Sequence, residues 1–246
     1  MLEVRDLHAW HGAAQALFGV SLTVGRGELV VLQGLNGAGK STLLQGIMGI
    51  GPRVEGAVRY QKKSILELPT HQRALLGLGY VPEDRRLFTA LTVRENLLIA
   101  ERQGNASVLA QRQEQVLQLF PALKGMLGRS AAHMSGGEQQ MLSVARTLMG
   151  NPLLVMLDEP AAGLATLERA RLMVLVKSLT QRQAGRAGMA VLYTEHNMDA
   201  VFGVADRVLV LIDGTLAAQG SPDEVARDAT VRQRYLGQWW EKPPHA

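Results

Sequence analysis

The stretch Gly34-Leu35-Asn36-Gly37-Ala38-Gly39-Lys40-Ser41 fills every fixed position of the phosphate-binding loop pattern G-x-x-x-x-G-K-[ST]. Its glycines let the backbone turn tightly and bring its N–H groups onto phosphate oxygens. Lys40 would neutralise the outer phosphates, and the Ser41 hydroxyl would ligate a magnesium ion. A helix start at Ser41 and Thr42 would add about half a unit of positive charge directed at the same anion. The stretch, together with Thr42, therefore predicts a binding site for a nucleoside triphosphate and Mg²⁺.

The sequence on either side supplies the two elements that this loop requires. The run Glu28–Gln33 is apolar enough for a buried strand, and Thr42–Met48 suits a helix. A chance match on a glycine-rich surface turn would lack this context, so we favour the functional interpretation.

Composition limits the classes of protein that the chain can belong to. Its 246 residues, 47% of them hydrophobic, can build one large domain or one domain with an inserted lobe. The sequence has no cysteine, which excludes disulfides and thiolate metal sites and suits a reducing cytosol. No apolar run approaches the roughly 20 residues that cross a bilayer, and Met1–Asp6 is not a secretory leader. We expect a soluble chain that docks onto membrane-embedded partners.

The net charge of +4 raises the question of nucleic-acid binding. The basic residues are scattered, and their densest groups, Lys62-Lys63 and Arg85-Arg86, are only dipeptides. An ordinary solvated surface explains them better than a nucleic-acid interface.

Patterns along the chain predict strands that alternate with helices. Short strands are expected at Leu2–Leu7 and Val20–Val24, and short strands and turns over Pro52–Pro69. From Thr92 to about Met126, apolar residues recur at spacings of mostly three and four, which predicts a helical lobe inserted at about residues 84–145.

The remainder of the chain continues this alternation. Further strands are expected at Leu78–Val81, Leu153–Leu157, Ala190–Thr194 and Val208–Ile212, and further helices at Glu138–Met149 and Leu167–Leu179. The stretch Gln181–Gly188 is predicted to be an exposed linker, and Ala217–Leu236 a short helical tail. Such alternation implies an α/β fold with a mostly parallel sheet and helices on both faces.

Two carboxylates, Asp158 and Glu159, end the apolar strand Leu153–Leu157. Buried strands often end in a solvated Asp, but beside a phosphate loop the pair has a chemical use. Asp158 would support the Mg²⁺ shell, and Glu159 would point at the attacking water. A general base in that place is worth about 10²–10⁴ in rate.

A second candidate anion site is the stretch Met134-Ser135-Gly136-Gly137-Glu138-Gln139-Gln140, in which a Ser-Gly-Gly turn opens a helix. One chain with one nucleotide has little use for two separate phosphate cradles. Two chains facing head to tail about a two-fold axis can place each Ser135–Gly137 turn over the nucleotide of the other chain.

These residues resemble the ATP-binding-cassette (ABC) family, whose signature is Leu-Ser-Gly-Gly-Gln or close to it. Met134 replaces the usual Leu, and Glu138 replaces Gln. The resemblance runs from about Leu2 to Leu236 and covers several motifs in the family's order. It implies a P-loop NTPase core, an antiparallel β subdomain, an inserted α-helical subdomain, and ATP hydrolysis with Mg²⁺ by a single domain spanning residues 1–246.

Two more residues match positions of known role in the family. His196 matches the switch histidine that contacts the γ-phosphate. Glu83 stands where most cassettes have a glutamine that touches Mg²⁺ and senses the transporter. A carboxylate keeps an oxygen ligand for a hard cation but loses the amide donors.

The resemblance also implies an adenine contact and a link between sites. His11 occupies the place of the aromatic residue that stacks on adenine, and Trp10 beside it is an alternative. Ala165 replaces the acidic residue with which many cassettes connect their two sites.

Within the family, the segments Glu83–Phe88, Thr92–Leu97 and Tyr235-Leu236-Gly237 resemble ATPases of branched-chain amino-acid importers, and Glu195-His196-Asn197-Met198 resembles their companion ATPase. Urea and amide importers have similar ATPases, and a non-transport regulatory cassette is a further alternative. A kinase or GTPase would lack the Ser-Gly-Gly turn. The implied partners are a second ATPase subunit (identical or different), membrane permeases and, indirectly, a periplasmic or lipid-anchored substrate-binding protein. The implied location is the cytoplasmic face of the plasma membrane.

Overall fold

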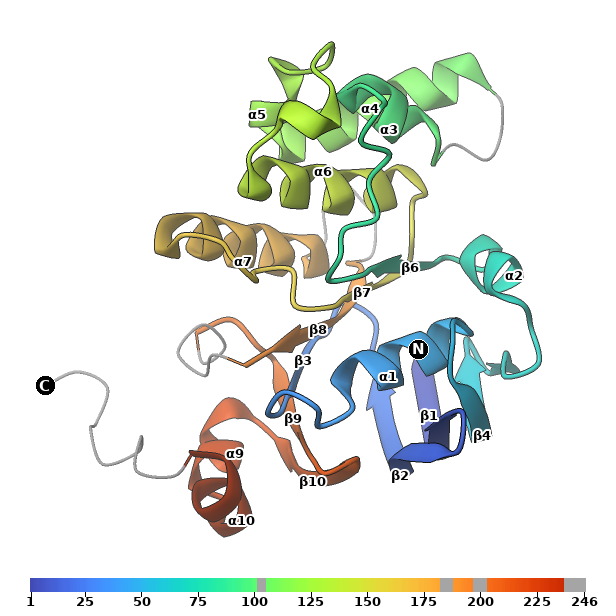
Figure 1. The fold of residues 1–246 in the computed structure, drawn as a ribbon, viewed down its shortest axis with the longest axis vertical. Helices are drawn as coiled ribbons and strands as arrows, with labels where there is room; N and C mark the ends of the chain where they lie inside the picture. The colour runs from blue at the N-terminus through green and yellow to red at the C-terminus, as the bar shows by residue number, and fades with distance from the viewer. Residues whose placement is uncertain (101–104, 182–187, 197–202, 237–246) are drawn as a thin grey trace, which may run out of the picture.

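The chain folds around two β-sheets, and a helical lobe lies at one end of the molecule (Figure 1). The computed structural model describes residues 1–100, 105–181, 188–196 and 203–236. The larger sheet contains, in spatial order, β10 (Thr215–Gly220), β9 (Arg207–Ile212), β3 (Leu29–Gln33), β8 (Ala190–Glu195), β7 (Leu154–Leu157) and β6 (Leu78–Val81). The smaller sheet contains β2 (Ala14–Val24), β1 (Leu2–His11), β4 (Arg53–Tyr60) and β5 (Lys63–Ser64).

Strand direction differs between the two sheets. The pairs β9–β3, β3–β8, β8–β7 and β7–β6 are parallel, and only β10 runs antiparallel to its neighbour β9. The smaller sheet is antiparallel throughout. The predicted fold class, a mostly parallel core with an antiparallel subdomain and a helical subdomain, is confirmed.

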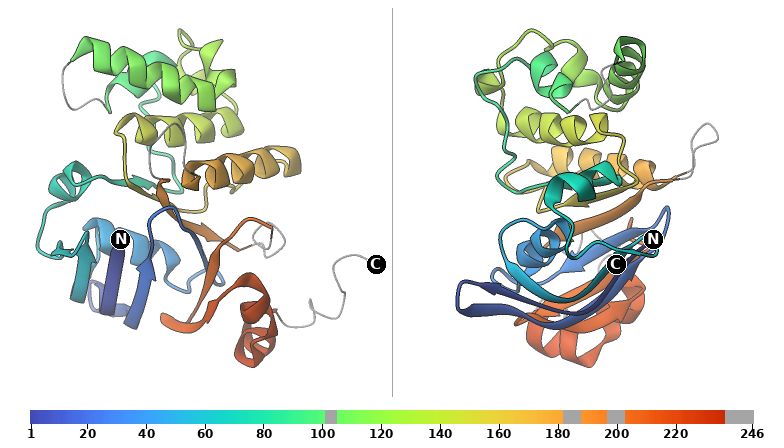
Figure 2. Two further views of the ribbon diagram at one scale, coloured as in Figure 1. Left: turned by 180° about the vertical axis from the view of Figure 1, so that it is seen from behind. Right: turned by 90° about the vertical axis from the view of Figure 1, so that its right-hand side faces the viewer.

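Helices cover both faces of the larger sheet and build the lobe. The α-helices are α1 (Lys40–Met48), α2 (Thr70–Leu75), α3 (Val93–Leu98), α4 (Ala106–Leu119), α5 (Pro121–Lys124), α6 (Gly136–Met149), α7 (Thr166–Thr180), α9 (Pro222–Arg227) and α10 (Ala229–Val231). A 3₁₀ turn, η1 (Ala131–His133), precedes α6, and a π turn, η2 (Arg232–Leu236), follows α10. The views of Figure 2 place α3 to α6 at one end of the molecule and α9 and α10 at the other.

The central strand β3 separates two buried clusters of apolar side chains. Val30 and Leu32 pack in the cluster that contains α1 and the smaller sheet. Leu29 and Val31 pack in the other cluster, which contains α6, α7 and the lobe. Because both faces of β3 are covered, its sequence is continuously apolar rather than alternating.

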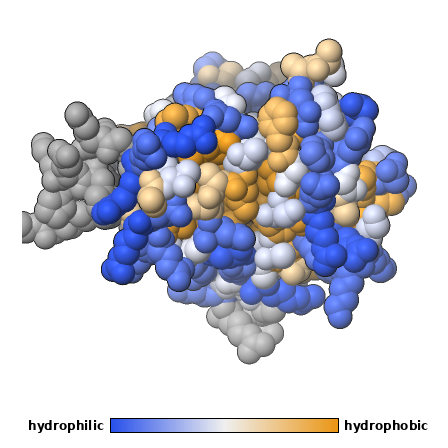
Figure 3. Space-filling view, turned by 90° about the horizontal axis from the view of Figure 1, so that it is seen from below, coloured by the Kyte–Doolittle hydropathy of each residue, from blue (hydrophilic) through white to orange (hydrophobic). Residues whose placement is uncertain are grey.

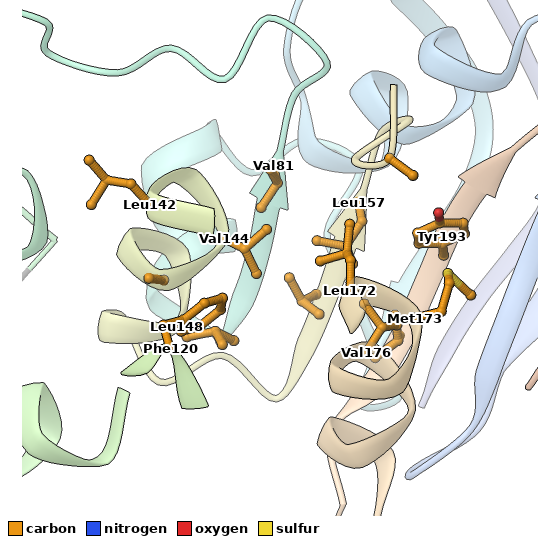
Figure 4. Close-up of a cluster of buried hydrophobic side chains, with 14 of the residues drawn as sticks. Val81, Phe120, Leu142, Val144, Leu148, Leu157, Leu172, Met173, Val176 and Tyr193 are labelled. Carbon is orange, nitrogen blue, oxygen red and sulfur yellow. The ribbon is translucent and has the colours of Figure 1, made fainter. Parts of the chain in front are cut away.

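The second cluster joins the lobe to the sheet. In Figure 4, Val144 of α6 lies near Val81 of β6, and Leu172 of α7 lies near Leu157 of β7. Phe120, which follows α4, belongs to the same cluster. Burial of apolar surface therefore continues without a break from the helical lobe into the core.

The molecular surface mixes polar and apolar groups. Polar side chains surround a band of apolar ones on the face shown in Figure 3. Such mixing is ordinary, because more than half of a folded protein's accessible surface is apolar. Within the described ranges, no helix combines the length and the apolar character needed to span a bilayer.

The predicted helical tail Ala217–Leu236 is wrong in its first part, because Ala217–Gly220 belongs to strand β10. The residues Asp213 and Gly214 have positive φ angles of 47° and 73° and form a two-residue turn that pairs β10 with β9. Asp-Gly is a strong signal for such a hairpin turn, and it is the signal that the prediction overlooked. The helices begin only at Pro222.

Other differences concern lengths and a short helix. Strands β1 and β2 extend to the turn at Gly12 and are longer than predicted. Helix α2 was not predicted, because its six residues carry no apolar period; only Arg73 is buried in it. Residues 182–187 of the predicted linker Gln181–Gly188 lie outside the described residues.

Candidate nucleotide-binding site

The phosphate loop connects β3 to α1 in a conformation that requires glycine. A Cβ atom on Gly34 would lie 2.5 Å from the carbonyl oxygen of Leu211. Gly39 has a φ of 102°, and a Cβ there would lie 2.7 Å from a methyl group of Leu17. Gly39 is also the N-cap of α1 and brings no side-chain acceptor, so the first N–H groups of the helix stay available to an anion.

Lys40 lies at the centre of this loop and is only 5% exposed. Its Nζ donates hydrogen bonds to the carbonyl oxygens of Gly34, at 3.0 Å, and Leu35, at 3.3 Å. The same Nζ lies 3.1 Å from Oε1 of Glu159. The buried ammonium is thus held at the loop by two carbonyl groups and one carboxylate.

Asp158 ends β7 and is nearly inaccessible, at 1% exposed. Its Oδ1 accepts hydrogen bonds from the Ser41 hydroxyl, at 3.0 Å, and from the Thr194 hydroxyl, at 3.1 Å. Its Oδ2 accepts one from the Tyr80 hydroxyl, at 3.1 Å. Burial raises the pKa of Asp158 above its usual value, while the three hydrogen bonds oppose that rise.

The pairing of strands explains why these groups meet. Tyr80 pairs with Met156 and Leu157 with Tyr193, so the carboxyl ends of β6, β7 and β8 lie at one edge of the sheet. Ligand sites in parallel sheets form at this edge. Burial and the adjacent Asp158 raise the pKa of Tyr80, which keeps its phenol protonated as a donor.

The Ser41 hydroxyl and the Asp158 carboxylate suit a magnesium ion. Mg²⁺ is commonly bound by one or two carboxylates and fills its remaining positions with phosphate oxygens and water. Among the described residues, no group of three or more His, Asp or Glu side chains is placed to hold a metal. One hydroxyl and one carboxylate, 3.0 Å apart, are a donor set that fits a cation shared with a phosphate ligand.

Glu159 follows Asp158 with a φ of 43°, a value uncommon for a residue with a side chain. Its N–H donates to the Thr194 hydroxyl at 2.7 Å. Since that hydroxyl also donates to Asp158, Thr194 fixes both acidic residues. Sequence reasoning missed Thr194 and Tyr80; their only signal is a polar group near the end of a strand beside β7.

His196 lies next to Glu159 at the end of β8. Its Nδ1 is 3.8 Å from Oε2 of Glu159 and 3.4 Å from Oε1 of Glu195. Glu195 is buried, and its carboxylate accepts hydrogen bonds from the Tyr193 hydroxyl and from the backbone N–H of His196. The structure therefore brings the predicted histidine to the predicted base. Asn197 and Met198 lie outside the described residues.

His11 and Trp10 leave β1 on opposite sides. Nε2 of His11 lies 3.1 Å from the hydroxyl of Thr42 on α1. The ring of Trp10 is covered by the guanidinium of Arg53, at 4.4 Å, and stacks with His8 at a centroid distance of 6.0 Å. Of the two candidates, His11 is the one beside the phosphate loop.

Glu83 is the third predicted metal ligand. It follows β6 at the same edge of the sheet as Asp158 and is exposed. In the part of the chain that the structure describes, its side chain forms no hydrogen bond or ion pair.

The Ser135–Gly137 turn opens helix α6 in the helical lobe. Ser135 and Glu138 form a capping box: the Glu138 carboxylate accepts from the Ser135 N–H at 2.7 Å, and the Glu138 N–H donates to the Ser135 hydroxyl at 3.3 Å. The hydrogen bond from the Ser135 backbone lowers the pKa of Glu138. Within the described ranges, Ser135–Gly137 forms no hydrogen bond with Gly34–Ser41, so one chain does not join the two cradles.

Comparison with known proteins agrees with this geometry. The family model described as ABC transporter matches residues 17–162. BraG of Pseudomonas aeruginosa, a high-affinity branched-chain amino acid transport ATP-binding protein, is 37% identical over 237 residues, which are 96% of this chain and 100% of that protein. LptB of Escherichia coli K12, a lipopolysaccharide export system ATP-binding protein, is 33% identical over 242 residues, 96% of this chain and 97% of that protein.

Solved structures agree on the fold. A nucleotide-free ATP-binding cassette from an ABC transporter has a TM-score of 0.81 at 27% identity, covering 97% of this chain and 99% of that one. The ADP conformation of an ATP-binding cassette of an ABC transporter has a TM-score of 0.81 at 26% identity, with the same coverage. The chain belongs to the ABC transporter family and is one of its ATPase subunits.

Proposed function

We propose that the chain hydrolyses ATP at the edge where the phosphate loop meets β7 and β8, and that hydrolysis powers the uptake of branched-chain amino acids. The observation that carries the chemical part is the direct contact of four groups. Lys40 meets Glu159 at 3.1 Å, and Ser41 meets Asp158 at 3.0 Å. A cation, a hydroxyl and two carboxylates around one helix start are what phosphoryl transfer to water requires.

ATP would bind along the loop Gly34–Ser41, with Thr42 completing the first turn of α1. The backbone N–H groups of that turn and the Lys40 ammonium would bind the phosphates. His11 would stack on adenine, since it lies beside Thr42, whereas the ring of Trp10 is already covered by Arg53. Stacking of this kind is worth about 1–3 kcal/mol per base.

Binding of the phosphates changes the partner of Glu159. Lys40 has three N–H donors, and the structure directs them at two carbonyl oxygens and the Glu159 carboxylate. A phosphate oxygen at Lys40 would compete with Glu159 for the ammonium. The carboxylate that is released can then accept the proton of the attacking water.

Ser41 and Asp158 would hold Mg²⁺, which when bound neutralises charge on the outer phosphates. Glu83 is proposed as a further oxygen ligand. Its exposed side chain lies on the segment that follows β6, at the same edge of the sheet as Asp158.

His196 would contact the γ-phosphate and hold the water against Glu159. Its Nδ1 lies 3.8 Å from the Glu159 carboxylate and 3.4 Å from the carboxylate of the buried Glu195. Thr194 accepts a hydrogen bond from the backbone of Glu159, and the next residue, Glu195, accepts one from the backbone of His196. The base and the histidine are therefore held by adjacent residues of β8.

The Ser135–Gly137 turn is proposed to bind the ATP of a second ATPase subunit, identical or different. A head-to-tail pair with two-fold symmetry places each turn over the other chain's phosphates.

We further propose a single domain over residues 1–246 with a helical lobe at about 84–145. Separate permeases, and indirectly a periplasmic or lipid-anchored binding protein, would be its partners at the cytoplasmic face of the membrane. Nucleic acid would not be a partner.

Import of branched-chain amino acids is favoured by the 37% identity to BraG and by the Glu83–Phe88 and Thr92–Leu97 segments. Lipopolysaccharide export is the competing substrate class, because LptB is 33% identical over a similar length. Urea or amide import is a further alternative, and a non-transport regulatory cassette is less favoured.

Deletion of the gene in its own host separates these alternatives. Uptake of radiolabelled leucine, isoleucine and valine should fall, while urea uptake and the amount of lipopolysaccharide at the cell surface should stay unchanged. Complementation with the unmodified gene should restore uptake, and complementation with Lys40→Ala should not. Unchanged leucine uptake together with loss of urea uptake or of surface lipopolysaccharide would refute the proposed substrate.

A further inference from the structure

The smaller sheet carries a row of polar side chains at the end where β1 begins. Glu3 of β1 pairs with Thr23 of β2 on one side and with Arg59 of β4 on the other. Residues that are paired across neighbouring strands point to the same face of a sheet, and Thr23 and Arg59 are both exposed. The three side chains therefore form one row across the outer face of the sheet.

Two turns lie at the end of this row. Arg26 is in the turn that follows β2, and Gln61 and Lys62 form the turn that joins β4 to β5. The row and the two turns, together with Met1 and Leu2, line one open hollow of about 620 Å³. Sites for small molecules typically have volumes of about 300–1,000 Å³. The hollow is therefore large enough for an organic ligand.

The charges around the hollow are unbalanced. Arg26, Arg59 and Lys62 are exposed, and none of them forms an ion pair or a side-chain hydrogen bond with any residue that the structure describes. The carboxylate of the lining, that of Glu3, accepts a hydrogen bond from Nε of Arg5 at 2.6 Å. Three positive charges thus converge on one hollow without a negative partner. The sequence shows only the dipeptide Lys62-Lys63, and the fold adds the two arginines.

The turn that supplies Lys62 is strained. Gln61 and Lys62 have φ angles of 50° and 69°, and the residues on either side, Tyr60 and Lys63, pair with each other. Such a type I′ turn favours Asn-Gly, because residues with longer side chains rarely adopt positive φ. Strained residues cluster at ligand sites, and this pair supplies a cation that Asn-Gly would lack. The N–H of Gln61 donates to the carbonyl oxygen of Met1 at 2.8 Å and anchors the turn to the start of β1.

The hollow is separate from the phosphate loop. His11, which lies beside Thr42, is the last residue of β1, whereas Glu3 lies near its start. A strand from Glu3 to His11 spans about 25 Å. The right-hand view of Figure 2 shows the N-terminus and the β1–β2 turn at opposite ends of the smaller sheet. A ligand in the hollow would not occupy the space of ATP.

The donors around the hollow suit a phosphate ester. A guanidinium binds phosphate through two parallel N–H donors, and a phosphate monoester carries about 1.5 to 2 negative charges at neutral pH. The Thr23 hydroxyl and the Gln61 amide add uncharged donors. A bare phosphate ion would leave most of the volume empty, whereas Met1 and Leu2 offer apolar surface to an organic group.

We propose that this hollow binds a phosphate monoester attached to a small organic group, either a soluble metabolite or the headgroup of an anionic phospholipid. Arg26 and Arg59 bind the phosphate, and Lys62 adds a third positive charge beside them. The site does not depend on the proposed function, because it shares no residue with the phosphate loop.

Two probes present the same phosphate monoester in the two forms. Glycerol 3-phosphate is the soluble form, and vesicles of phosphatidylcholine with phosphatidic acid present it on a membrane; vesicles of phosphatidylcholine alone are the blank. The full chain with Lys40→Ala is used, so that the phosphate loop contributes less to binding. Glycerol 3-phosphate should shift the amide NMR signals of residues 23–26 and 59–63 more than those of residues 34–42. Flotation measures binding to vesicles.

The two probes distinguish the sources of the ligand. Binding of glycerol 3-phosphate supports a site for a soluble metabolite. Binding of the phosphatidic acid vesicles alone supports a site for a lipid headgroup. Failure of both probes to bind would overturn the proposal, and so would shifts confined to residues 34–42.

Single substitutions test which cations bind the probe. Arg26→Gln and Arg59→Gln should each weaken binding about tenfold, and Lys62→Gln about threefold, because a lysine forms no bidentate contact. Arg53→Gln, at the other end of β4, and Lys63→Gln are the matched controls: each removes one charge from the same sheet outside the lining of the hollow. Equal losses in the variants and the controls would show a general attraction to positive charge and would overturn the site.

The double variant Gln61→Asn with Lys62→Gly tests the strained turn. It should raise the urea midpoint of unfolding, because Asn-Gly adopts the type I′ turn with less strain, and it should weaken probe binding at least as much as Lys62→Gln. A more stable protein that binds less well is the expected result. Unchanged probe affinity, or a midpoint that does not rise, would contradict the assignment of this turn to a ligand.

Discussion

At the scale of single residues, three hydroxyl groups, including that of Tyr80, and one ammonium control where the acidic groups point. Thr194 accepts from the Glu159 backbone and donates to Asp158, while Ser41 donates to the same carboxylate oxygen. Lys40 holds the Glu159 side chain at 3.1 Å. Because these groups are buried or partly buried, a donor or acceptor that lost its hydrogen bond would destabilise the fold by about 1–3 kcal/mol. The acidic pair is therefore fixed before any substrate arrives.

Glu159→Gln should slow ATP hydrolysis by about 10²-fold or more, because the base is lost while the phosphate contacts remain. Affinity for ATP should not fall, because a neutral amide competes less for Lys40. Phosphate release and titration with a fluorescent ATP analogue measure the two quantities. Glu114→Gln, which removes a surface carboxylate 3.5 Å from Lys124, is the control and should leave turnover unchanged. Turnover of Glu159→Gln within a few-fold of the unmodified protein would contradict the proposed role.

Thr194→Val should lower kcat by about tenfold, because it frees the Glu159 backbone and removes one of the three hydrogen bonds to Asp158. ATP affinity should change less, since the hydrogen bonds of Ser41 and Tyr80 to Asp158 remain. Steady-state kinetics separates the two effects. Thr180→Val removes a buried hydroxyl that donates to the carbonyl oxygen of Lys177 at the C-terminal end of α7, the end farther along the chain from Glu159, and controls for the change of volume. An equal loss of activity in both variants would show that Thr194 acts on stability alone.

At the scale of elements, the pairing of strands assembles the site, and a hairpin anchors the sheet to its neighbour. The β9–β10 turn contacts β2, because the N–H of Phe18 donates to the carbonyl oxygen of Gly214 at 2.9 Å. A Cβ on Gly214 would lie 2.3 Å from the carbonyl oxygen of Ala16. This turn therefore links the two sheets where only glycine fits.

Gly214→Ala should lower the free energy of unfolding by clearly more than the roughly 1–2 kcal/mol that a left-handed alanine costs. Urea denaturation measures the loss. Gly12→Ala is the matched control, since Gly12 has a similar φ of 61° but nothing within 4 Å of an added Cβ. Equal losses in the two variants would show that the contact with Ala16 carries no penalty.

The sequence predicted the phosphate loop and the acidic pair, because their chemistry lies in fixed local spacings that need no partner strand. It did not predict Thr194 or Tyr80, whose roles depend on the alignment of β6 and β8 with β7. The same limit applies to Glu83, which a motif places in the site but which the structure leaves exposed. Strand β10 was not predicted for another reason: its apolar residues were interpreted as part of a helix, although the Asp213-Gly214 dipeptide before them indicates a hairpin turn.

At the scale of the whole molecule, the two cradles lie on separate parts of one chain. Lys40 belongs to the core and Ser135 to the helical lobe, and their segments share no hydrogen bond among the described residues. A second copy, turned head to tail, would bring them together in two equivalent sites. Each site would then need Lys40 from one chain and Ser135 from the other.

Mixing two inactive variants tests this shared site most directly. Lys40→Ala and Ser135→Arg should each be nearly inactive as pairs of identical chains. In a mixed pair, one site regains Lys40 from the second variant and Ser135 from the first. The account predicts recovery of ATPase activity on mixing, or of ATP-dependent pairing if both sites are needed for turnover. If the natural partner is a different ATPase, the two changes are divided between the partners. No recovery by either measurement, in mixed pairs shown to form by mass spectrometry, would contradict the account.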